Sequence, residues 1–183
     1  LNFHTMTQEE KDILAWYNQQ YGTHYDESNW IDIVDWYNIS FHQSLSEPFM
    51  EKHAERLDWG NISSNQTLSE PFIERHAERL DWWNISFNQS LSEPFMERHA
   101  ERLDWYNISR HQSLSEPFME RHAERLDWGR ISRYQSLSER LIEKFAERLP
   151  KGFRDNNWLY ADRAEKLRHI HDKAPEFVVQ EDA

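Results

Sequence analysis

A period of 23 residues constrains the fold of this chain more than any other feature of its sequence. The phrase LDWWNISFNQSLSEPFMERHAER, residues 80–102, returns with small changes along the chain. Its first tryptophan recurs at Trp36, Trp59, Trp82, Trp105 and Trp128, and its second leucine at Leu45, Leu68, Leu91, Leu114 and Leu137. Self-similarity at a fixed period of this size predicts a stacked array, in which each unit buries its apolar face only against its neighbours.

The first half of each unit predicts a short helix with one apolar face. In the segment DWYNISFHQ, Asp35 is a typical N-cap, because its carboxylate accepts hydrogen bonds from the first free N–H groups of the helix. Four residues share one helical face at this spacing: Trp36, Ile39, Ser40 and Gln43. We expect this stripe to face the core.

The second half of each unit predicts another helix over SEPFMEKHAERL, residues 46–57. Ser46 is its N-cap, and Pro48 lies in the first turn, where the missing N–H costs nothing. Apolar and charged residues occupy opposite faces, with Phe49, His53 and Leu57 on one and Glu51, Lys52, Glu55 and Arg56 on the other. Because no segment alternates with a period of two, we predict an all-α protein, an α-solenoid of about five 23-residue two-helix repeats.

The two ends depart from the repeat, which predicts three regions. Residues 1–35 form an N-terminal capping region, in which Thr7 and Glu10 are a capping box and Gly22 ends the helix. Residues 36–149 hold five tandem repeats. Residues 150–183 are expected to hold a C-terminal capping helix and a loose tail.

The composition predicts a folded, acidic, water-soluble chain. Of its residues 30% are charged and the net charge is −12, but 14% are aromatic, and disordered chains are poor in aromatic residues. With 0 cysteines there is no disulfide frame or thiolate metal site, which suits a reducing compartment. No apolar run reaches the length of a membrane span. We therefore expect the protein in the cytoplasm, of a bacterium or of a host cell.

One histidine recurs in four of the units, at His53, His76, His99 and His122. A shared metal ion would need ligand atoms about 2 Å away, whereas stacked helices stand about 8–10 Å apart. The fifth unit has Phe145 at this position, and phenylalanine can replace a packing residue but not a ligand. We therefore interpret the histidines as partly buried, hydrogen-bonded packing residues and expect no metal. A further hypothesis is that their protonation makes the array sensitive to acid.

Asparagine-glycosylation sequons also recur with the repeat. Asn-Ile-Ser occurs at Asn38, Asn61, Asn84 and Asn107, and similar sequons begin at Asn65 and Asn88. We interpret the asparagines of Asn-Ile-Ser as exposed residues of the first helix and the sequons as by-products of the repeat.

Paired carboxylates such as Glu51 and Glu55 occur in every unit. A catalytic pair needs one privileged environment that separates two pKa values, and no unit breaks the pattern to provide one. We therefore expect no enzymatic activity, no catalytic residue and no cofactor. The acids are expected to interleave with basic residues along the stack, and Arg56 and its counterparts to brace the following turn through caps of the Asp58 type.

The positions that vary between units are the second, sixth and seventh after the N-cap aspartate of the first helix. They hold Tyr37, Phe41 and His42, then Gly60, Ser64 and Asn65, then Trp83, Phe87 and Asn88, then Tyr106, Arg110 and His111, and finally Gly129, Arg133 and Tyr134. Outward aromatic residues with arginine have the composition of an interface core. We predict that the chain binds another protein through Tyr37, Phe41, Trp83, Phe87, Tyr106, Arg110 and Arg133. The alternative is that some of these rings pack between neighbouring repeats.

Charge is distributed unevenly, from −6 in residues 1–35 to +4 in residues 128–154. The basic footprint of a nucleic-acid-binding protein is missing overall, so direct binding of nucleic acid is not expected. The acidic total instead supports an alternative function, that of a DNA-like decoy that inhibits a nucleic-acid-binding protein, such as a phage or viral counter-defence factor.

The phrase LSEPFMERHAERLDWxxIS resembles a short tandem repeat of the type LSExFIEKxxDKLDWxxISxxQ, found in proteins of giant viruses, phages and some bacteria. The resemblance covers roughly residues 34–149. It implies an α-helical array and a viral or bacterial origin, and it brings no catalytic residues.

Overall fold

The computed structural model describes residues 5–151 and 153, and all of the secondary structure among them is helical. The predicted all-α repeat fold is confirmed. The chain forms two compact units, Leu1–His111 and Gln112–Ala183. The predicted C-terminal capping helix and tail lie outside the described residues, apart from the first few residues of that region.

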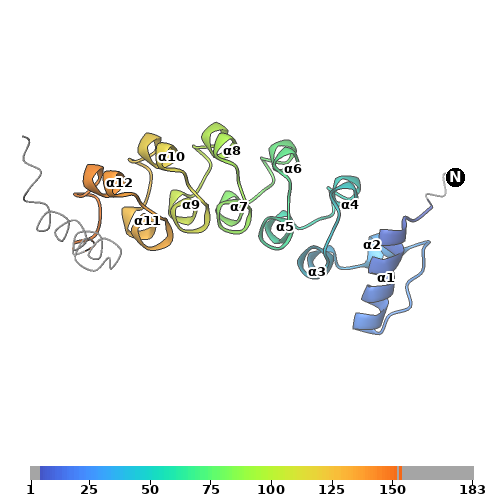
Figure 1. Cartoon of the computed structure of the whole chain (residues 1–183). Coiled ribbons are helices and arrows are strands. Elements are labelled where there is room, and N and C mark those ends of the chain that lie inside the picture. Colours follow the sequence, from blue (N-terminus) through green and yellow to red (C-terminus); the bar gives the residue numbers. More distant parts are fainter. Residues whose placement is uncertain (1–4, 152, 154–183) are drawn as a thin grey trace, which may run out of the picture. The chain divides into compact units, whose positions relative to one another are not determined.

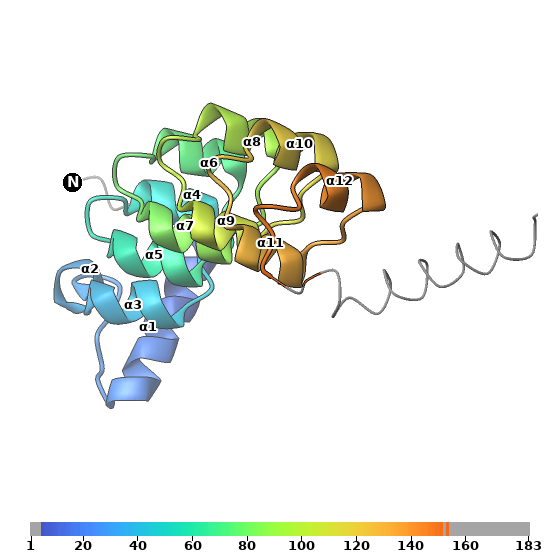
Figure 2. The same ribbon diagram turned by 90° about the vertical axis from the view of Figure 1, so that its left-hand side faces the viewer.

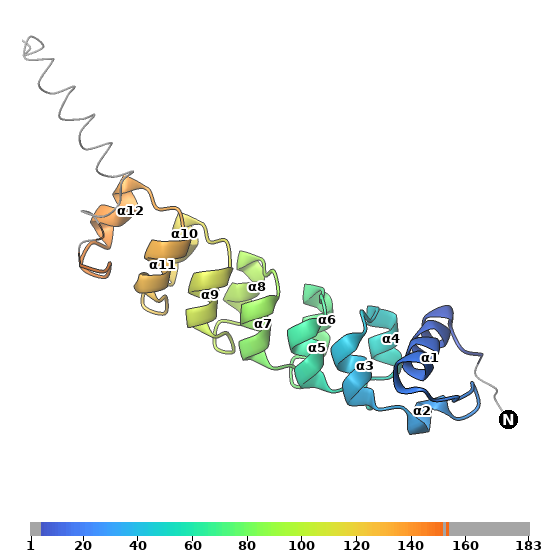
Figure 3. The same cartoon turned by 90° about the horizontal axis from the view of Figure 1, so that it is seen from below.

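The first unit contains a long N-terminal helix, a one-turn helix and the helices of the first repeats. These are α1 (Gln8–Tyr21), α2 (Trp30–Ile33), α3 (Trp36–His42), α4 (Glu47–Lys52), α5 (Trp59–Asn65), α6 (Glu70–Arg75), α7 (Trp82–Asn88), α8 (Glu93–Arg98) and α9 (Trp105–His111). The first helices of successive repeats pack against one another, α3 on α5, α5 on α7 and α7 on α9, while α4, α6 and α8 form a second row (Figure 1). Seen from below, α3, α5, α7 and α9 lie roughly parallel (Figure 3).

The second unit continues the pattern with α10 (Glu116–Arg121), α11 (Trp128–Tyr134) and α12 (Glu139–Lys144). Here α11 is a first helix of the repeat, and α10 and α12 are second helices (Figure 2).

Each first helix has seven residues, too few to be stable alone. The predicted aspartate caps are present, and Asp58 accepts a hydrogen bond from the backbone N of Asn61 at 2.8 Å. The isoleucines of the predicted apolar face are fully buried, at Ile39, Ile62, Ile85 and Ile108. Burial of such a side chain contributes about 1.5–3 kcal/mol, so caps and stacking together hold these short helices.

The second helix is shorter than the 12 residues that the sequence predicts. α4 ends at Lys52, because His53 leaves helical geometry at φ −109° and ψ 19°. The backbone N of Arg56 then donates to the His53 carbonyl at 2.8 Å, in a tight turn. This turn brings Leu57 back to the core and starts the next first helix, so a continuous helix to Leu57 was the wrong prediction.

Glutamine side chains form a ladder between repeats, and the sequence alone did not indicate this role. Gln66 is the C-cap of α5, and its buried amide Nε2 donates to the Gln43 carbonyl at 2.6 Å. Its Oε1 accepts from the backbone N of Leu45 at 2.8 Å. The glutamine therefore satisfies the backbone of the preceding loop, and it caps the helix instead of belonging to the apolar stripe.

Serine side chains form a second ladder. Ser63 is fully buried; its Oγ donates to the Trp59 carbonyl at 2.6 Å and accepts from the backbone N of Asp81, one repeat later, at 2.9 Å. Ser40 makes the same contacts with Trp36 and Asp58. Each serine therefore joins its own helix to the start of the next first helix.

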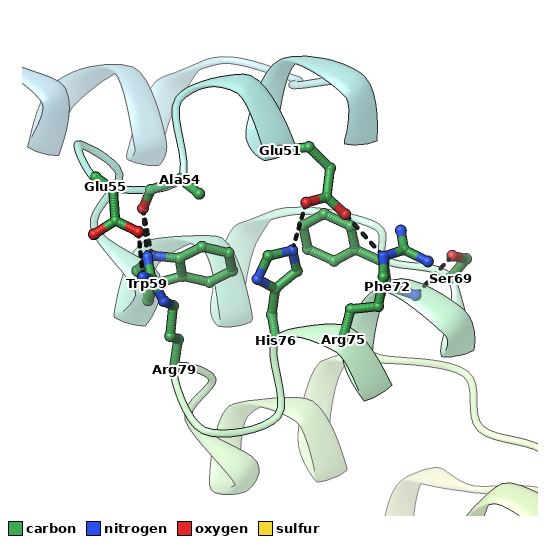
Figure 4. A network of polar contacts seen from close by, with 9 residues as sticks. All are labelled: Glu51, Ala54, Glu55, Trp59, Ser69, Phe72, Arg75, His76 and Arg79. Atoms are coloured by element: carbon green, nitrogen blue, oxygen red, sulfur yellow. Dashed lines mark hydrogen bonds and ion pairs between the residues drawn. The ribbon is translucent and has the colours of Figure 1, made fainter.

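Arginine side chains brace the preceding repeat, and the prediction that they contact the aspartate caps is wrong. The guanidinium of Arg79 donates to the Ala54 carbonyl at 2.9 Å and forms an ion pair with Glu55 (Figure 4). It lies 5.5 Å from the ring centroid of Trp59, whose Nε1 donates to the same Ala54 carbonyl at 2.9 Å. The turn after the second helix reverses the chain, and this places the arginine against the previous turn.

The N-terminal region supplies the contacts that a preceding repeat would make. In the repeats, the Glu47 carboxylate accepts from the backbone N of Ser69 at 2.7 Å, and in α1 Glu9 accepts from Ser46 in the same way at 2.8 Å. The α1 helix begins with the predicted capping box of Thr7 and Glu10 and ends at Gly22, in left-handed geometry with φ 63°.

The turn at α2 supplies the remaining contacts that a preceding repeat would make. The Ile31 carbonyl accepts from Trp36 Nε1 and from Arg56, each at 3.0 Å, as the Ala54 carbonyl accepts from Trp59 and Arg79. The residue at the position of a repeat histidine is Trp30, whose ring lies 5.7 Å from that of Trp36. Helix α1 and the turn at α2 thus close the first repeat with side chains that the 23-residue period does not reveal.

Candidate functional site: an exposed aromatic surface

The five predicted aromatic residues are exposed on the first helices of the first unit. Tyr37 is 57% and Trp83 is 53% exposed, and Phe41, Phe87 and Tyr106 are also exposed. Large aromatic residues usually bury most of their area, so an exposed set of this kind is unusual. We call Tyr37, Phe41, Trp83, Phe87 and Tyr106 the aromatic surface.

The two predicted arginines differ in position. Arg110 follows Tyr106 on α9 and is half-buried, whereas Arg133 is exposed on α11 of the second unit. The sequence therefore grouped seven residues, of which the structure places six on the first unit.

The rings of the aromatic surface are arranged in stacked pairs. Residues four apart on a helix lie one above the other, and the rings of Tyr37 and Phe41 are parallel to within 6° with centroids 6.4 Å apart. The rings of Trp83 and Phe87 are parallel to within 8° at 5.3 Å. Each pair thus places two parallel, exposed rings on its helix. Packing between repeats, the alternative, is present at Phe87, whose ring also contacts His111 of the next repeat.

Histidines at the seventh position after the cap aspartate, His42 and His111, connect these pairs to the neighbouring helices. The Phe41 ring is 4.6 Å from His42, which is 6.0 Å from Trp16 of α1. The Phe87 ring is 4.2 Å from His111 of α9. Partial burial, reinforced by the charge of Arg110, lowers the pKa of His111, which favours the neutral form of this ring. The extension onto Trp16 was missed in the sequence, because α1 lies outside the repeat.

Helix α5 separates the two stacked pairs and carries only small groups on the same face. Its variable positions hold Gly60, Ser64 and Asn65. The hydroxyl of Ser64 donates to the Gly60 carbonyl at 3.1 Å, and Asn65 Nδ2 donates to the Asn61 carbonyl at 3.1 Å. These polar groups form their hydrogen bonds within their own helix. Helix α5 therefore carries small polar side chains between the two helices that bear the stacked pairs.

On the first helices of the first three repeats the charge is of one sign. The first helices and following loops of the first three repeats, residues 35–46, 58–69 and 81–92, contain the cap aspartates Asp35, Asp58 and Asp81 and no lysine or arginine. Arginine first enters this face at Arg110. An incoming partner would therefore meet aromatic rings next to carboxylates.

The carboxylates of the second helices are occupied by contacts between repeats. Glu51 binds Arg75 Nε at 2.9 Å and His76 Nε2 at 3.0 Å (Figure 4). Burial raises the pKa of Glu51, but hydrogen bonds from Arg75 and His76 outweigh it, and the pKa lies below its ordinary value. The predicted interleaving of opposite charges is thus present, and these carboxylates stay ionised in ion pairs.

The recurring histidines lie among aromatic rings, as the packing interpretation predicts. The ring of His76 is 4.7 Å from Trp59 and 4.5 Å from Phe72. In the second unit, Phe145 takes the equivalent place, 4.4 Å from Trp128. Among the described residues, no group of three or more histidine, aspartate or glutamate side chains is arranged to hold a metal ion.

His53 is the most buried of these histidines and contacts Glu10 of α1 at 2.7 Å. Burial alone would raise the pKa of Glu10, but hydrogen bonds from Lys52, Thr7 and His53 lower it to about 2. Burial also lowers the pKa of His53, because the opposing attraction of Glu10 is smaller.

The sequon asparagines are less exposed than predicted. Asn38, Asn61 and Asn84 are half-buried and Asn107 is only 2% exposed, so the prediction of exposed side chains is wrong. The third residue of the first helix is turned toward the rest of the array, as the buried Nδ2 of Asn61 indicates. The other two sequon asparagines, Asn65 and Asn88, are exposed.

No protein-family model, curated protein or solved structure matches the chain. The resemblance to the tandem repeat of viral and bacterial proteins therefore stays a prediction. None of the helices in the described part of the chain is long and apolar enough to cross a membrane.

Proposed function

We propose that this chain is a non-enzymatic cytoplasmic scaffold that binds another protein through the aromatic surface of its first helices. The observation that carries the proposal is the exposure of Tyr37, Phe41, Trp83 and Phe87 as two stacked pairs on a row of packed helices. Interface hot spots are rich in tryptophan and tyrosine, because a large rigid ring buries much area at a low cost in conformational entropy.

The internal comparison between repeats supports the same surface. The residues that stay constant form the hydrogen-bond ladders of Gln66, Ser63 and Arg79, which hold one repeat on the next. The rings at the variable positions make none of these ladder contacts, so they can change without loss of the array. A surface that varies on a constant frame suits recognition of a particular partner.

The alternative function, an acidic decoy of DNA, is less well supported. A decoy needs a regular row of free carboxylates, whereas Glu51 and Glu74 are bound to Arg75 and Arg98 of the next repeat. Ion pairs of this kind reduce the charge that the second helices present to a partner.

The double substitution Trp83→Ala and Phe87→Ala tests the proposal. The wild-type chain and the variant would be used as bait for affinity capture from cells of the native host, and captured proteins would be compared by mass spectrometry. We expect the variant to lose a partner that the wild type captures, with at least about a tenfold loss of affinity when that partner is purified, since two hot-spot rings are removed.

The matched control is Ser90→Ala, which changes an exposed polar residue just after the same helix and should leave capture unchanged. Circular dichroism must show equal helicity in all three proteins. Unchanged capture by the aromatic variant would refute the proposal. Capture that is lost in 0.5 M salt and after neutralisation of the second-helix glutamates, but not after loss of the rings, would support the decoy.

A further inference from the structure

The second helix of a repeat and its turn bind two basic side chains of the repeat that follows. In the second unit, the Glu120 carboxylate pairs with Lys144 and the Glu124 carboxylate with Arg148. The Ala123 carbonyl, which lies between the two glutamates in the chain, accepts from the same Arg148 at 3.4 Å. Figure 4 shows the corresponding contacts in the first unit. Two carboxylates and one carbonyl thus form a recurring binding set for two basic residues four positions apart.

The fifth repeat presents this binding set on an open surface. Glu143 and Glu147 stand one period after the carboxylates just named, and both are exposed. Ala146 is exposed as well, whereas its counterpart Ala123 is only 8% exposed. In the described part of the chain, no group forms an ion pair with Glu143 or Glu147, and none donates to the Ala146 carbonyl. The same positions bind basic side chains in the other repeats, and this observation indicates the ligand here.

The sequence does not continue the donors of the repeat beyond this point. A sixth repeat would place its tryptophan at position 151 and its two basic residues at positions 167 and 171. The chain has Lys151, Leu167 and His171 there. The 23-residue period therefore supplies no arginine for the fifth repeat.

A second copy of the chain does not supply the donors either. Stacked end to end, it would offer Lys52 and Arg56, the basic residues of its first repeat. These are already bound by its own N-terminal region, Lys52 to Glu10 at 2.6 Å and Arg56 to Asp32 at 2.8 Å. The occupant is therefore sought in a different protein.

We infer that the fifth repeat binds a helix–turn segment of another protein through Glu143, Ala146 and Glu147, and that this segment carries two basic residues four positions apart. Charge complementarity selects a basic occupant. Within the repeats the first basic residue is lysine or arginine, but the second is arginine in all five. One planar guanidinium can donate to a carbonyl and a carboxylate at once, so we expect arginine at the second position of the partner too. This surface belongs to the second unit and goes beyond the proposed function, which uses the first.

A peptide with the sequence SEPFMERHAERLD, a copy of residues 92–104, tests the inference. Within the first unit its Arg98 binds Glu74 at 2.7 Å. Its Arg102 pairs with Glu78 and donates to the Ala77 carbonyl at 3.1 Å. Binding to the isotope-labelled full chain would be followed by NMR at about 50 mM and about 300 mM salt. We expect a version with glutamine for both arginines to bind at least about tenfold more weakly, and the arginine peptide to lose affinity at the higher salt concentration.

Paired substitutions in the full chain locate the site. The variant Glu143→Gln with Glu147→Gln should weaken binding of the arginine peptide at least about tenfold, because both carboxylates lose their charge. The matched control is Glu74→Gln with Glu78→Gln, which makes the same change where the next repeat already supplies the arginines, and it should leave affinity within about twofold. The variant without the rings of the aromatic surface should also stay within about twofold. Circular dichroism checks that all variants keep the helicity of the wild type.

The inference is overturned if the arginine peptide does not bind, if the arginine and glutamine peptides bind equally, or if the two glutamate pairs have the same effect. Binding that emerges only after the three arginines of residues 154–183 are replaced by glutamine would assign the surface to the chain's own C-terminal segment, and it would overturn the inference as well. None of these outcomes bears on the proposed function, which the removal of Trp83 and Phe87 tests separately.

Discussion

The side-chain amide of Gln89 donates from Nε2 to the backbone carbonyl of Gln66, one repeat earlier, at 2.7 Å. Its Oε1 accepts from the backbone N of Leu68 at 2.9 Å. One buried side chain thus satisfies a donor and an acceptor of a loop that belongs to another repeat. Buried backbone groups without partners are costly, so this ladder allows the loops to lie inside the array.

Replacement of Gln89 by alanine tests the importance of the ladder. We expect Gln89→Ala to lower the free energy of unfolding by about 2–4 kcal/mol, because it leaves a buried carbonyl and a buried N–H without partners. Urea denaturation followed by circular dichroism measures the change. The exposed neighbour Asn88 provides the control, and Asn88→Ala should change stability by less than about 0.5 kcal/mol. Equal effects of the two substitutions would contradict the role of the ladder.

Ser63 and Ser64 are adjacent serines with opposite expected effects. Ser63→Ala removes the acceptor for the backbone N of Asp81, one repeat later, and we expect a loss of about 1–2 kcal/mol. The Ser64 hydroxyl donates only to carbonyls of its own helix, so Ser64→Ala should be within about 0.5 kcal/mol of the wild type. The same denaturation experiment decides, and a larger loss for Ser64→Ala would show that the ladder is misassigned.

Arg79 combines an exposed ion pair with a backbone contact, and the two can be separated. Glu55→Gln removes only the charge of an exposed partner, and we expect a change below about 0.5 kcal/mol. Arg79→Met also removes the hydrogen bond to Ala54 and the stacking on Trp59, so we expect a loss of about 1–2 kcal/mol. If both variants lost the same stability, the ion pair would be the main contribution.

Acid should destabilise the N-terminal end of the array. The pKa of Glu10 is about 2 in the folded chain against an ordinary 4.5, so the unfolded chain takes up this proton first and stability is lost as pH falls from 4.5 to 2. The pKa of buried His53 is lowered from 6.5, so stability also falls as pH drops below 6.5. Both groups act in the same direction.

Urea titrations at pH 7.5, 5 and 3 measure this dependence. The free energy of unfolding should decrease at each step, and Glu10→Gln should flatten the step between pH 5 and pH 3, because its side chain does not titrate. His53→Phe, which copies Phe145 of the fifth repeat, should flatten the step between pH 7.5 and pH 5. A pH dependence that is identical in wild type and both variants would contradict this assignment.

The sequence by itself determined the repeat, the helical class and the start of α1 and of the two helices of each repeat. Asp58 and Ser46 could be assigned as caps because a cap is specified by residues within one turn of the chain. The exposed position of Tyr37 and Trp83 could also be predicted, since variable residues spaced by four lie on one helical side.

Only the tertiary structure decided where the second helix ends and what joins the repeats. Gln66 binds a loop 21–23 residues away, and Ile31 takes the place of a repeat alanine for an arginine 25 residues away. Nothing local to Gln66 or Ile31 marks these roles, because their partners arrive only when one repeat stacks on another. Local propensity fixes the units, whereas the hydrogen bonds between units depend on the geometry of the stack.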